Sequence, residues 1–490
     1  MRHLVFTTSA LLLLSSSLCS GDNFEADLDG FDTQEVSTIQ ESESSDLDGF
    51  DDEPMQLEED APTQTKSDIF TLSGNTAFKT ALGYNEHGVK ARKSDASAIE
   101  YSGLTQTQLS LYLQLDAKLS DNWKIRISGD TFYDAIYDIK SSNNYNQDTL
   151  NAYQTQLRLD DTYIQGRLSP DLDIKIGRQI VVWGKSDSIR ITDVINPLDN
   201  RLPGMTDIED LRLSTTMAKL DYYVDSWNLS AMIIGESRTF MEAAPRSEFF
   251  PVDSIFPNAP DPFIELQKPD ISLDNMQYAL AVNGVFSGWD LSFYAADVLD
   301  SKWYLEGTLP NATRNVSKIQ MLGSAFNLAY GSWLFKSEVA YLENIHYNST
   351  ADKKNRLDML VGFDYMGIRD SVLSLELANR HIFDYEQQMS GMTLGTVPDY
   401  IQEDEVQTAL RATRSFNNDS LNATLLLSMF GHNWQYGGFF RASLEYDVMD
   451  AVVANFGIID YLDTAKTEDK PFIHALSDND KIFADISYSF

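Results

Sequence analysis

The sequence predicts an all-β fold, a transmembrane antiparallel β-barrel of about 18 strands (16 being possible) in the outer membrane of a Gram-negative cell. Three observations predict it: hydrophobic residues alternate with period two from Ser73 onward, short and long connections alternate, and the last strand ends on an aromatic residue. The mean hydropathy is only -0.29, because in a barrel only every second residue faces lipid. The barrel is therefore expected to occupy residues 73–490.

The clearest alternation lies between residues 105 and 120. Its aliphatic positions are Leu109, Leu111, Leu113, Leu115, Ala117 and Leu119, and its intervening positions are Ser110, Tyr112, Gln114, Asp116 and Lys118. Since successive side chains of a strand point to opposite faces, one face is apolar and the other polar, as a wall between lipid and a wet lumen requires. Only Asp121-Asn122 separates this segment from the next, which predicts a tight hairpin turn.

The same reading, carried along the chain, predicts eighteen strands. They are expected at 74–84, 105–120, 123–138, 153–168, 172–183, 214–226, 227–236, 275–286, 289–299, 319–330, 332–342, 356–366, 371–383, 403–416, 419–430, 436–447, 451–462 and 481–490. Short connections follow the even strands and long ones follow the odd strands, except for a short one near Gly431 to Gln435. Short periplasmic turns and long extracellular loops are typical of outer-membrane barrels, which places both termini in the periplasm.

The C-terminal strand carries an assembly signal. Ile486, Tyr488 and Phe490 alternate with polar or small residues, and the chain ends on Phe490. An exposed aromatic edge strand is a liability in solution. It makes sense if the barrel-assembly machinery captures it and the barrel then closes in outer-membrane lipid.

The N-terminus is typical of a secretory signal peptide, expected at residues 1–21. Arg2 provides a positive charge, Leu4 to Leu14 form an apolar stretch too short to span a bilayer, and small residues follow. The residues before Cys19, the only cysteine, do not fit a lipidation motif. The mature chain is therefore expected to lack cysteine and disulfide bonds.

Residues 22–72 are expected to form a disordered, acidic, periplasmic segment. Between Asp22 and Asp60 there are sixteen Asp and Glu residues and no Lys or Arg, so the segment cannot bury enough apolar surface to offset the entropy of ordering. A six-residue string occurs twice, nineteen positions apart. Its copies are Asp27, Leu28, Asp29, Gly30, Phe31 and Asp32, and Asp46, Leu47, Asp48, Gly49, Phe50 and Asp51.

The repeated string has three interpretations. A short linear motif would use Leu and Phe as anchors and its aspartates against a basic partner surface. Calcium binding by the clustered carboxylates is less well matched, because an EF-hand needs more oxygen ligands and a distant Glu. The third interpretation is a low-complexity solvating sequence. We expect the first, with an inner-membrane exporter or a periplasmic carrier as the partner.

One stretch of the sequence contains residues that the alternation of a strand does not explain. Gly177-Arg178-Gln179 ends a strand, Trp183-Gly184 and Lys185 follow, and Asn196-Pro197 lies further along the loop. The segment resembles domain-of-unknown-function family 1302, a set of outer-membrane barrel proteins. The resemblance implies a barrel that works beside resistance-nodulation-division type exporters and periplasmic lipid-carrier-like proteins. It also implies a hydrophobic or amphiphilic cargo.

The same residues predict a loop that folds into the barrel. An arginine in a barrel lumen usually pairs with acids, and Arg178 has three candidates: Asp187, Asp193 and Asp199. Asn196-Pro197 would fix a turn. The loop is then either a constriction or gate, or a latch that only braces the wall. The expected lumen or gate residues are Arg178, Gln179, Trp183, Lys185, Asp187, Asp193, Asn196, Pro197 and Asp199.

The longest loop, 237–274, contains six of the fourteen prolines and the aromatic residues Phe249, Phe250, Phe256 and Phe263. Prolines stiffen a loop, and exposed aromatic residues require apolar contacts. The loop is expected to cap the mouth of the barrel, to form an apolar site where cargo enters or leaves, or simply to pack against other loops.

Charge and motifs limit the function. A net charge of -37 argues against nucleic-acid binding. The histidines of the mature chain occur singly, and no Gly-x-Ser-x-Gly or His-Glu-x-x-His pattern is present, so we expect no enzyme, no metal and no cofactor. The predicted function is a passive conduit whose cargo comes from an export partner. The alternatives are a porin for small solutes, an outer-membrane lipase or protease, and a surface adhesin.

Overall fold

The structure, a computed structural model, describes residues 69–85, 89–92, 98–250, 263–270, 272–307, 311–390, 401–463, 473 and 476–490. The chain divides into two units, Met1–Lys66 and Ser67–Phe490, and the described residues belong to the second. The predicted signal peptide, most of the predicted acidic segment and both copies of the repeated string lie outside the described residues.

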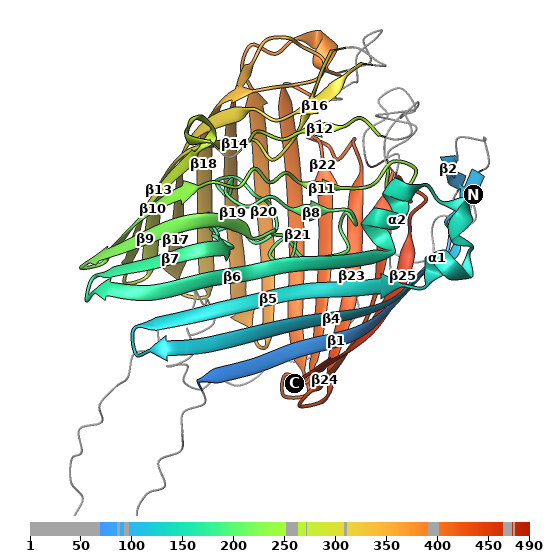
Figure 1. Ribbon diagram of the computed structural model, residues 1–490, viewed down its shortest axis with the longest axis horizontal. Helices are drawn as coiled ribbons and strands as arrows, with labels where there is room; N and C mark the ends of the chain where they lie inside the picture. Colours follow the sequence, from blue (N-terminus) through green and yellow to red (C-terminus); the bar gives the residue numbers. More distant parts are fainter. Residues whose placement is uncertain are drawn as a thin grey trace, which may run out of the picture. The chain divides into compact units, whose positions relative to one another are not determined.

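Eighteen antiparallel strands form one sheet that closes on itself (Figure 1). Neighbours in the chain pair in order, and the last strand pairs with the first, so the sheet has no free edge. The strands are β1 (Phe70–Gly83), β4 (Gly103–Ser120), β5 (Trp123–Asp134), β6 (Thr155–Ser169), β7 (Leu172–Gln179), β9 (Thr215–Val224), β10 (Trp227–Ile234), β13 (Gln277–Phe286), β14 (Trp289–Leu299), β17 (Lys318–Tyr330), β18 (Trp333–Ile345), β19 (Lys354–Ile368), β20 (Ser371–Ile382), β21 (Asp404–Phe416), β22 (Leu421–Phe430), β23 (Gly438–Met449), β24 (Val452–Leu462) and β25 (Lys481–Ser489).

Every predicted strand is present, and two of them end four residues earlier than predicted. The strand expected to reach residue 138 ends at Asp134, whose Oδ1 accepts the backbone N–H groups of Thr107 (2.9 Å) and Ile136 (3.0 Å) and so starts a helical turn. The strand expected to reach residue 183 ends at Gln179. The predicted number of eighteen is therefore confirmed.

Short elements occupy the long connections. They are β2 (Val89–Arg92), β3 (Ala98–Glu100), α1 (Ile136–Ile139), η2 (Ser142–Asn144), α2 (Gln147–Tyr153), β8 (Asp199–Asn200), β11 (Met241–Glu242), β12 (Leu266–Gln267), η3 (Leu273–Asn275), β15 (Tyr304–Glu306), β16 (Thr313–Asn315) and η4 (Gln387–Ser390). In the part of the chain that the structure describes, no helix is both long and apolar enough to cross a bilayer.

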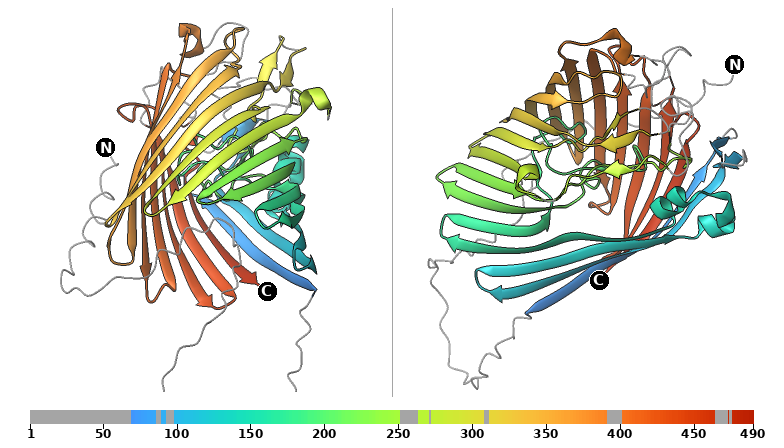
Figure 2. Two further views of the ribbon diagram at one scale, coloured as in Figure 1. Left: turned by 90° about the vertical axis from the view of Figure 1, so that its left-hand side faces the viewer. Right: turned by 45° about the horizontal axis from the view of Figure 1, so that its top comes forward.

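The two ends of the barrel differ, as the connection lengths predicted. At one end strands are joined by tight turns such as those after β4, β6 and β9, and at the other by the long loops. β1 starts, and β25 ends, at the end with the tight turns. The views in Figure 2 show the long connections gathered at the opposite end and partly inside the barrel.

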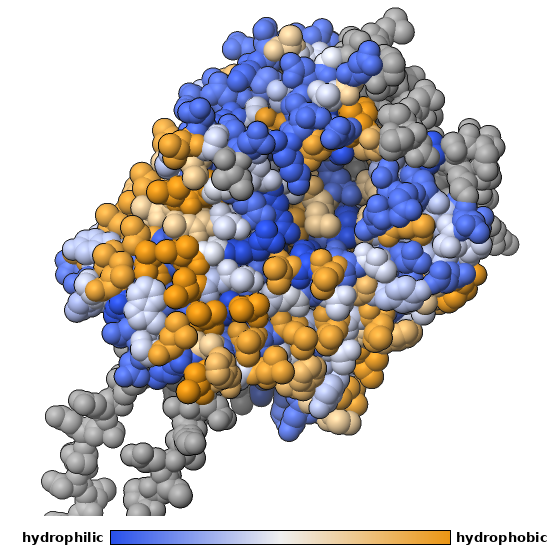
Figure 3. Space-filling model, in the orientation of Figure 1, coloured by the Kyte–Doolittle hydropathy of each residue, from blue (hydrophilic) through white to orange (hydrophobic). Residues whose placement is uncertain are grey.

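The outer face of the barrel is apolar. Leu109 on β4 is 59% exposed, and Leu157, Leu280 and Leu322 are exposed in the same way. Figure 3 shows a band of hydrophobic residues across the strands and hydrophilic residues over the long loops. Aromatic residues gather where strands meet the tight turns, as an interfacial girdle does. They include Trp123, Trp227, Phe286, Trp289, Tyr330, Trp333, Tyr365, Phe416 and Tyr446, and several of their rings pack together.

The C-terminal aromatic residues lie at the closing seam, where β25 pairs with β1. Ile486, Tyr488 and Phe490 are about half exposed on the outer face, and the rings of the last two stack at 6.1 Å. The backbone of Phe490 exchanges two hydrogen bonds with Gly74 of β1 (2.9 and 3.0 Å). A Cβ atom on Gly74 would lie 2.6 Å from the Phe490 ring and 2.8 Å from the carbonyl oxygen of Tyr112, so glycine lets this aromatic residue pack closely at the seam.

The inner face differs from the predicted polar lining on one side of the barrel. The inward side chains of β9, β10, β13, β14, β17 and β18 are mostly apolar and buried, and a loop inside the barrel packs against them. The inward residues are Met217, Met232, Ile234, Ala279, Ala281, Tyr294, Ala296, Val298, Ile319, Met321, Ala325, Ala340 and Leu342. The main hydrophobic core of the protein therefore lies within the lumen, on one wall.

Candidate functional site

The loop between β7 and β9, residues 180–214, folds into the barrel and divides into two lobes. We call residues 180–196 the first lobe and residues 197–213 the second lobe. Asn196, which is fully buried, stands between them. Its Oδ1 accepts the backbone N–H of Val181 (2.8 Å), and its Nδ2 donates to the carbonyls of Gln179 (3.2 Å) and Leu213 (2.8 Å). One side chain thus fixes both ends of the loop.

The first lobe covers the apolar inner wall. Its buried side chains Val181, Trp183, Ile189, Ile191 and Ile195 join the core formed by β9 to β18. The Trp183 ring stacks on the ring of Tyr294 of β14, with centroids 4.7 Å apart. Burial of this apolar surface holds the lobe on the wall.

A buried glutamate of β18 binds the backbone of the first lobe. Glu338 is 2% exposed, and its carboxylate accepts the N–H groups of Lys185 (2.6 Å), Ser186 (2.8 Å) and Thr192 (3.2 Å). It also accepts the Thr192 hydroxyl at 2.8 Å. Its carboxylate oxygens would lie 2.8 Å from a Cβ atom on Gly184, whose φ is +91°. The glycine of the Trp183-Gly184 pair is therefore needed so that the backbone can approach the carboxylate.

A second glutamate and a lysine extend this attachment. Glu376 of β20, 1% exposed, accepts the N–H groups of Asp187 (2.7 Å) and Ser188 (3.1 Å). The Lys336 amine of β18 contacts the Asp187 carboxylate and lies 2.7 Å from that of Asp364 on β19. Charged groups of β18 and β20 therefore hold the first lobe at its backbone and at two side chains, those of Asp187 and Thr192.

Arginines connect the first lobe to the second. The Asp193 carboxylate lies 2.8 Å from the Arg212 guanidinium, with both side chains at least 90% buried, and 3.3 Å from that of Arg190. Burial lowers the pKa of the Arg190 guanidinium, and the charge of Asp193 opposes this shift. Further along, Asp199 pairs with Arg201 (2.6 Å). The base of the second lobe is thus fixed to the first by buried charges.

The second lobe also pairs with the longest loop. Its strand β8 pairs with β11 in parallel, Asp199 opposite Met241. Figure 1 shows both short strands inside the ring of long strands. Phe249 and Phe250 of the longest loop are buried, and Phe249 packs with Leu202 and Met205 of the second lobe. Of the other two phenylalanines expected to need apolar contacts, Phe263 packs on Phe250, and Phe256 lies outside the described residues.

The tip of the second lobe reaches the wall at β21 and β23. The carboxylate of Asp207 lies 3.0 Å from the guanidinium of Arg411 and contacts that of Arg441. Arg441 also donates to the carbonyl of Gly204 at 3.2 Å. One carboxylate between two arginines, together with the Gly204 carbonyl, therefore anchors the lobe after it has crossed the lumen.

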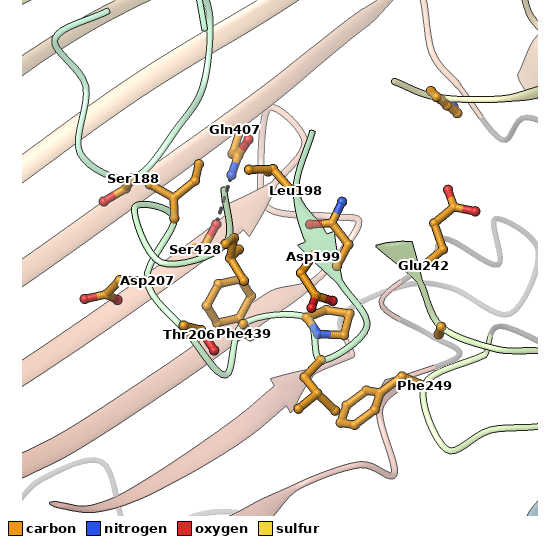
Figure 4. Close-up of a pocket in the computed structure, with 18 of the residues that line it drawn as sticks. Ser188, Leu198, Asp199, Thr206, Asp207, Glu242, Phe249, Gln407, Ser428 and Phe439 are labelled. Carbon is orange, nitrogen blue, oxygen red and sulfur yellow. Dashed lines mark hydrogen bonds between the residues drawn. The ribbon is translucent and has the colours of Figure 1, made fainter. Parts of the chain in front are cut away.

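The second lobe separates two cavities in the lumen. The one we call the outer cavity has a volume of about 490 Å³ and is lined by both lobes, the longest loop and strands β21 to β23. Figure 4 shows Asp207, Thr206 and Phe439 close together on one side of it, and Phe249 and Glu242 on the other. The cavity that we call the inner cavity has a volume of about 680 Å³ and is more polar. Residues that line both are Asp199, Leu202, Thr206, Asp207, Leu211, Phe249 and Arg411.

The predicted position of Arg178 in the lumen is wrong. Odd positions of β7 face inward, where Lys175 is 6% exposed and Gln179 is fully buried, whereas Ile176 is 46% exposed. Arg178 therefore points outward, and its guanidinium lies 2.5 Å from the carboxylate of Glu236, which also accepts the Thr216 hydroxyl. None of the three predicted aspartates pairs with Arg178.

The other predicted lumen residues belong to the inward loop or its base. Gln179 donates to carbonyls of β7 and β9, the Lys185 amine lies 3.7 Å from the carboxylate of Asp290 on β14, and the carbonyl of Pro197 accepts the N–H of Leu213. Sequence reasoning missed the wall residues that bind the loop. They are Lys336, Glu338, Asp364, Glu376, Arg411 and Arg441. Each is a charged residue within a strand, at a position that faces the lumen.

No catalytic or metal-binding arrangement stands out among the described residues. None of their His, Cys, Asp and Glu side chains form a cluster able to hold a metal ion. The His381 ring lies 3.0 Å from the Asp404 carboxylate, which the Asn379 amide also contacts. Within the described ranges, no serine hydroxyl hydrogen-bonds to this histidine.

Comparison with known proteins places the chain in a family. The closed barrel and its apolar exterior are those of an outer-membrane protein. Among solved structures, it is similar to Acinetobacter baumannii OccAB3 (10% identity, 86% of this chain and 99% of that chain, TM-score 0.47) and OccAB2 (11%, 86% and 98%, 0.49). It is also similar to Salmonella typhi OmpF (10%, 86% and 97%, 0.41). No curated protein matches it. The model of the family described as "Protein of unknown function (DUF1302)" matches residues 30–490, and the chain belongs to that family.

Proposed function

We propose that the barrel is a passive conduit with a built-in gate, and that the second lobe is the gate. The observation that supports this is the position of the lobe between the outer and inner cavities. The first lobe is held by a large apolar contact and several buried charges, whereas the tip of the second lobe is held by the Asp207 carboxylate and by hydrogen bonds to the carbonyls of Pro203 and Gly204. The weakly held lobe moves, and the strongly held lobe serves as its base.

The lining of the outer cavity supports a hydrophobic or amphiphilic cargo. Phe249, Phe250, Phe439, Leu202 and Leu426 supply apolar surface, and a few charged groups lie among them. Ligand sites for small molecules usually have this composition and a volume of about 300–1,000 Å³. A porin for small hydrated solutes, the main alternative, would be expected to have a polar constriction instead.

The first prediction concerns the tip of the gate. Asp207→Asn removes the charge that holds the lobe and leaves the Arg411 and Arg441 guanidinium groups without a counter-ion. Loss of a charged hydrogen-bond partner of this kind costs about 2–3 kcal/mol, so the ratio of open to closed barrels should rise roughly 30- to 160-fold. Single-channel conductance in planar bilayers measures this ratio as the open fraction.

Asp210→Asn is the matched control. Asp210 lies on the same lobe, but its carboxylate has no ion-pair partner within 4 Å among the described residues, so the open fraction should stay near that of the wild type. Equal open fractions for Asp207→Asn and the wild type would refute the gate. Hydrolysis of a lipid or peptide by the purified barrel would favour the enzyme alternative.

We further propose that an export partner delivers the cargo. The two copies of the repeated string, at 27–32 and 46–51, recruit an inner-membrane exporter or a periplasmic carrier. Two copies on one chain raise the effective concentration of the partner beyond that of a single weak site. This requires the end with the tight turns to face the periplasm, because β1 starts there.

The second prediction tests this recruitment. A barrel that lacks residues 22–60 should assemble normally, because all eighteen strands lie outside the deletion, but cellular export of the cargo should fall several-fold. Replacing Leu28, Phe31, Leu47 and Phe50 with alanine should have the same effect, and replacing serines between the repeats should not. Undiminished export by the deletion variant would eliminate the recruitment role while leaving the gate untouched.

A further inference from the structure

Arg411 links the gate to the outer cavity. Its guanidinium is partly exposed, lines both cavities and lies 3.0 Å from Asp207. Its Nε is buried, and among the described residues it has no hydrogen-bond partner. An arginine fork matches a carboxylate best when two of its N–H groups donate side by side. Asp207 pairs with one end of the Arg411 guanidinium and leaves the Nε donor without a partner among the described residues.

The other carboxylates around the outer cavity are already compensated. Asp187 contacts Lys336, and Asp199 pairs with Arg201. The carboxylate of Glu242 accepts a hydrogen bond from the Trp303 indole N–H, and the positive charges of Lys302 and Arg314 stabilise its ionised form. Of the two cations that line this cavity, Arg411 and Lys302, Arg411 is the one that already binds a carboxylate of the gate.

Apolar surface lies next to Arg411. Phe439 and Leu426 come from the strands beside it, and Phe249 and Leu202 come from the inward loops. In the view of Figure 4, Phe439 lies beside Asp207 and Thr206, while Gln407 and Ser428 form a hydrogen-bonded pair above it (3.2 Å). A molecule with a polar end at Arg411 would place the rest of its length among aromatic rings.

We propose that the outer cavity binds an amphiphile that carries a carboxylate. Its apolar body lies among Phe249, Phe250 and Phe439, and its carboxylate replaces Asp207 at Arg411. The gate already holds a carboxylate at this arginine, so the ligand offers the same chemical group and competes for the same donors. This inference rests on the proposed gate, because it makes the cargo the agent that releases the second lobe.

The competition predicts opposite effects for two substitutions. Arg411→Gln removes the charged donor to the ligand carboxylate and should weaken binding about tenfold, the loss expected for a charge-assisted hydrogen bond. Asp207→Asn removes the internal competitor and should tighten binding by about the same factor. A purely structural role for either residue would weaken binding in both variants.

Equilibrium binding of radiolabelled dodecanoate to the full barrel in lipid nanodiscs tests this, with empty nanodiscs subtracted and dodecanol as the uncharged probe. We expect dodecanol binding to be the same in both variants. Arg414→Gln is the matched control, because Arg414 lies on the same strand, faces outward and stacks on Phe416. Each variant is checked for the folded, heat-modifiable band in gel electrophoresis.

The outcomes separate the inference from the gate. Dodecanoate binding that is unchanged in Arg411→Gln, or that weakens in Asp207→Asn, overturns the carboxylate site. Equal affinity of the wild type for dodecanol and dodecanoate overturns it as well. Conductance of Asp207→Asn without any ligand tests the gate alone. If Arg411→Gln does not assemble, the Asp207→Asn variant still tests the carboxylate site, because the inference requires this variant to bind dodecanoate more tightly than the wild type does.

Discussion

Replacing Glu338 with alanine is expected to detach the first lobe from the wall and leave the barrel open for much of the time. Four hydrogen bonds converge on this carboxylate, three of them from backbone N–H groups. Without it, those donors remain buried and unpaired, and each costs about 1–3 kcal/mol. Allowing for relaxation and water entry, we expect the attachment of the lobe to weaken by about 3–5 kcal/mol.

Two measurements report on the lobe. Conductance in planar bilayers should rise above that of Asp207→Asn, because the base of the gate moves as well as its tip. Trypsin should cut after Lys185 or Arg190, whose side chains are only 22% and 14% exposed in the intact loop. Glu343→Ala is the matched control, since this glutamate lies on the same strand at an outward position and should change neither readout.

A second substitution at the same position distinguishes detachment of the lobe from a general failure of Glu338→Ala to assemble. Glu338→Gln keeps the shape of the side chain and one carbonyl oxygen, but its NH2 group is a donor that faces other donors. We expect an intermediate increase in conductance and slower trypsin cleavage than in Glu338→Ala. A Glu338→Ala barrel with the conductance and cleavage pattern of the wild type would show that the apolar contacts alone hold the lobe.

The strands could be predicted because their signal is local. Alternation within ten residues and the length of each connection define a strand and its turn without knowledge of the partner strand. The inward loop was predicted from Asn196-Pro197 and the charges around it, but its partners on the wall were not. Glu338 is 153 positions from Lys185, and Glu376 is 189 positions from Asp187, so only the closed barrel brings them together.

The error at Arg178 has a simple physical cause. Its role was inferred from its type and from nearby acids, whereas the face of a strand residue depends on the parity of its position. Buried Lys175 and Gln179 set the inward parity of β7, and Arg178 falls on the other face. Its partner Glu236, reached across β9, is 58 positions away and belongs to another connection.

The missed wall residues did leave a signal in the sequence. Glu338 stands between Ser337 and Val339, Asp364 between Phe363 and Tyr365, and Glu376 between Leu375 and Leu377. An ionisable residue within a membrane-spanning segment is costly and usually serves a function. The apolar inner wall also left a trace, because β13 has apolar or small residues at consecutive positions from Tyr278 to Val282.

Lys336→Met should strongly destabilise the barrel. The amine is 1% exposed and neutralises Asp364, which is 4% exposed, together with Asp187. Methionine preserves most of the apolar stem but leaves two carboxylates near each other without a cation. Removing one partner of a buried ion pair costs about 3–5 kcal/mol. Unfolding by guanidinium in phospholipid vesicles, followed by tryptophan fluorescence, measures this loss.

The double variant Lys336→Met/Asp364→Asn decides whether charge is the cause. If the uncompensated carboxylate accounts for the loss, the double variant should be more stable than Lys336→Met, because it buries a neutral amide instead of an unpaired charge. Lys219→Met is the control, since the Lys219–Asp221 pair is more hydrated (23% and 11% exposed) and should cost much less. A double variant no more stable than the single one would mean that Lys336 acts through packing. The charges around the first lobe would then fix its position without contributing to the stability of the wall.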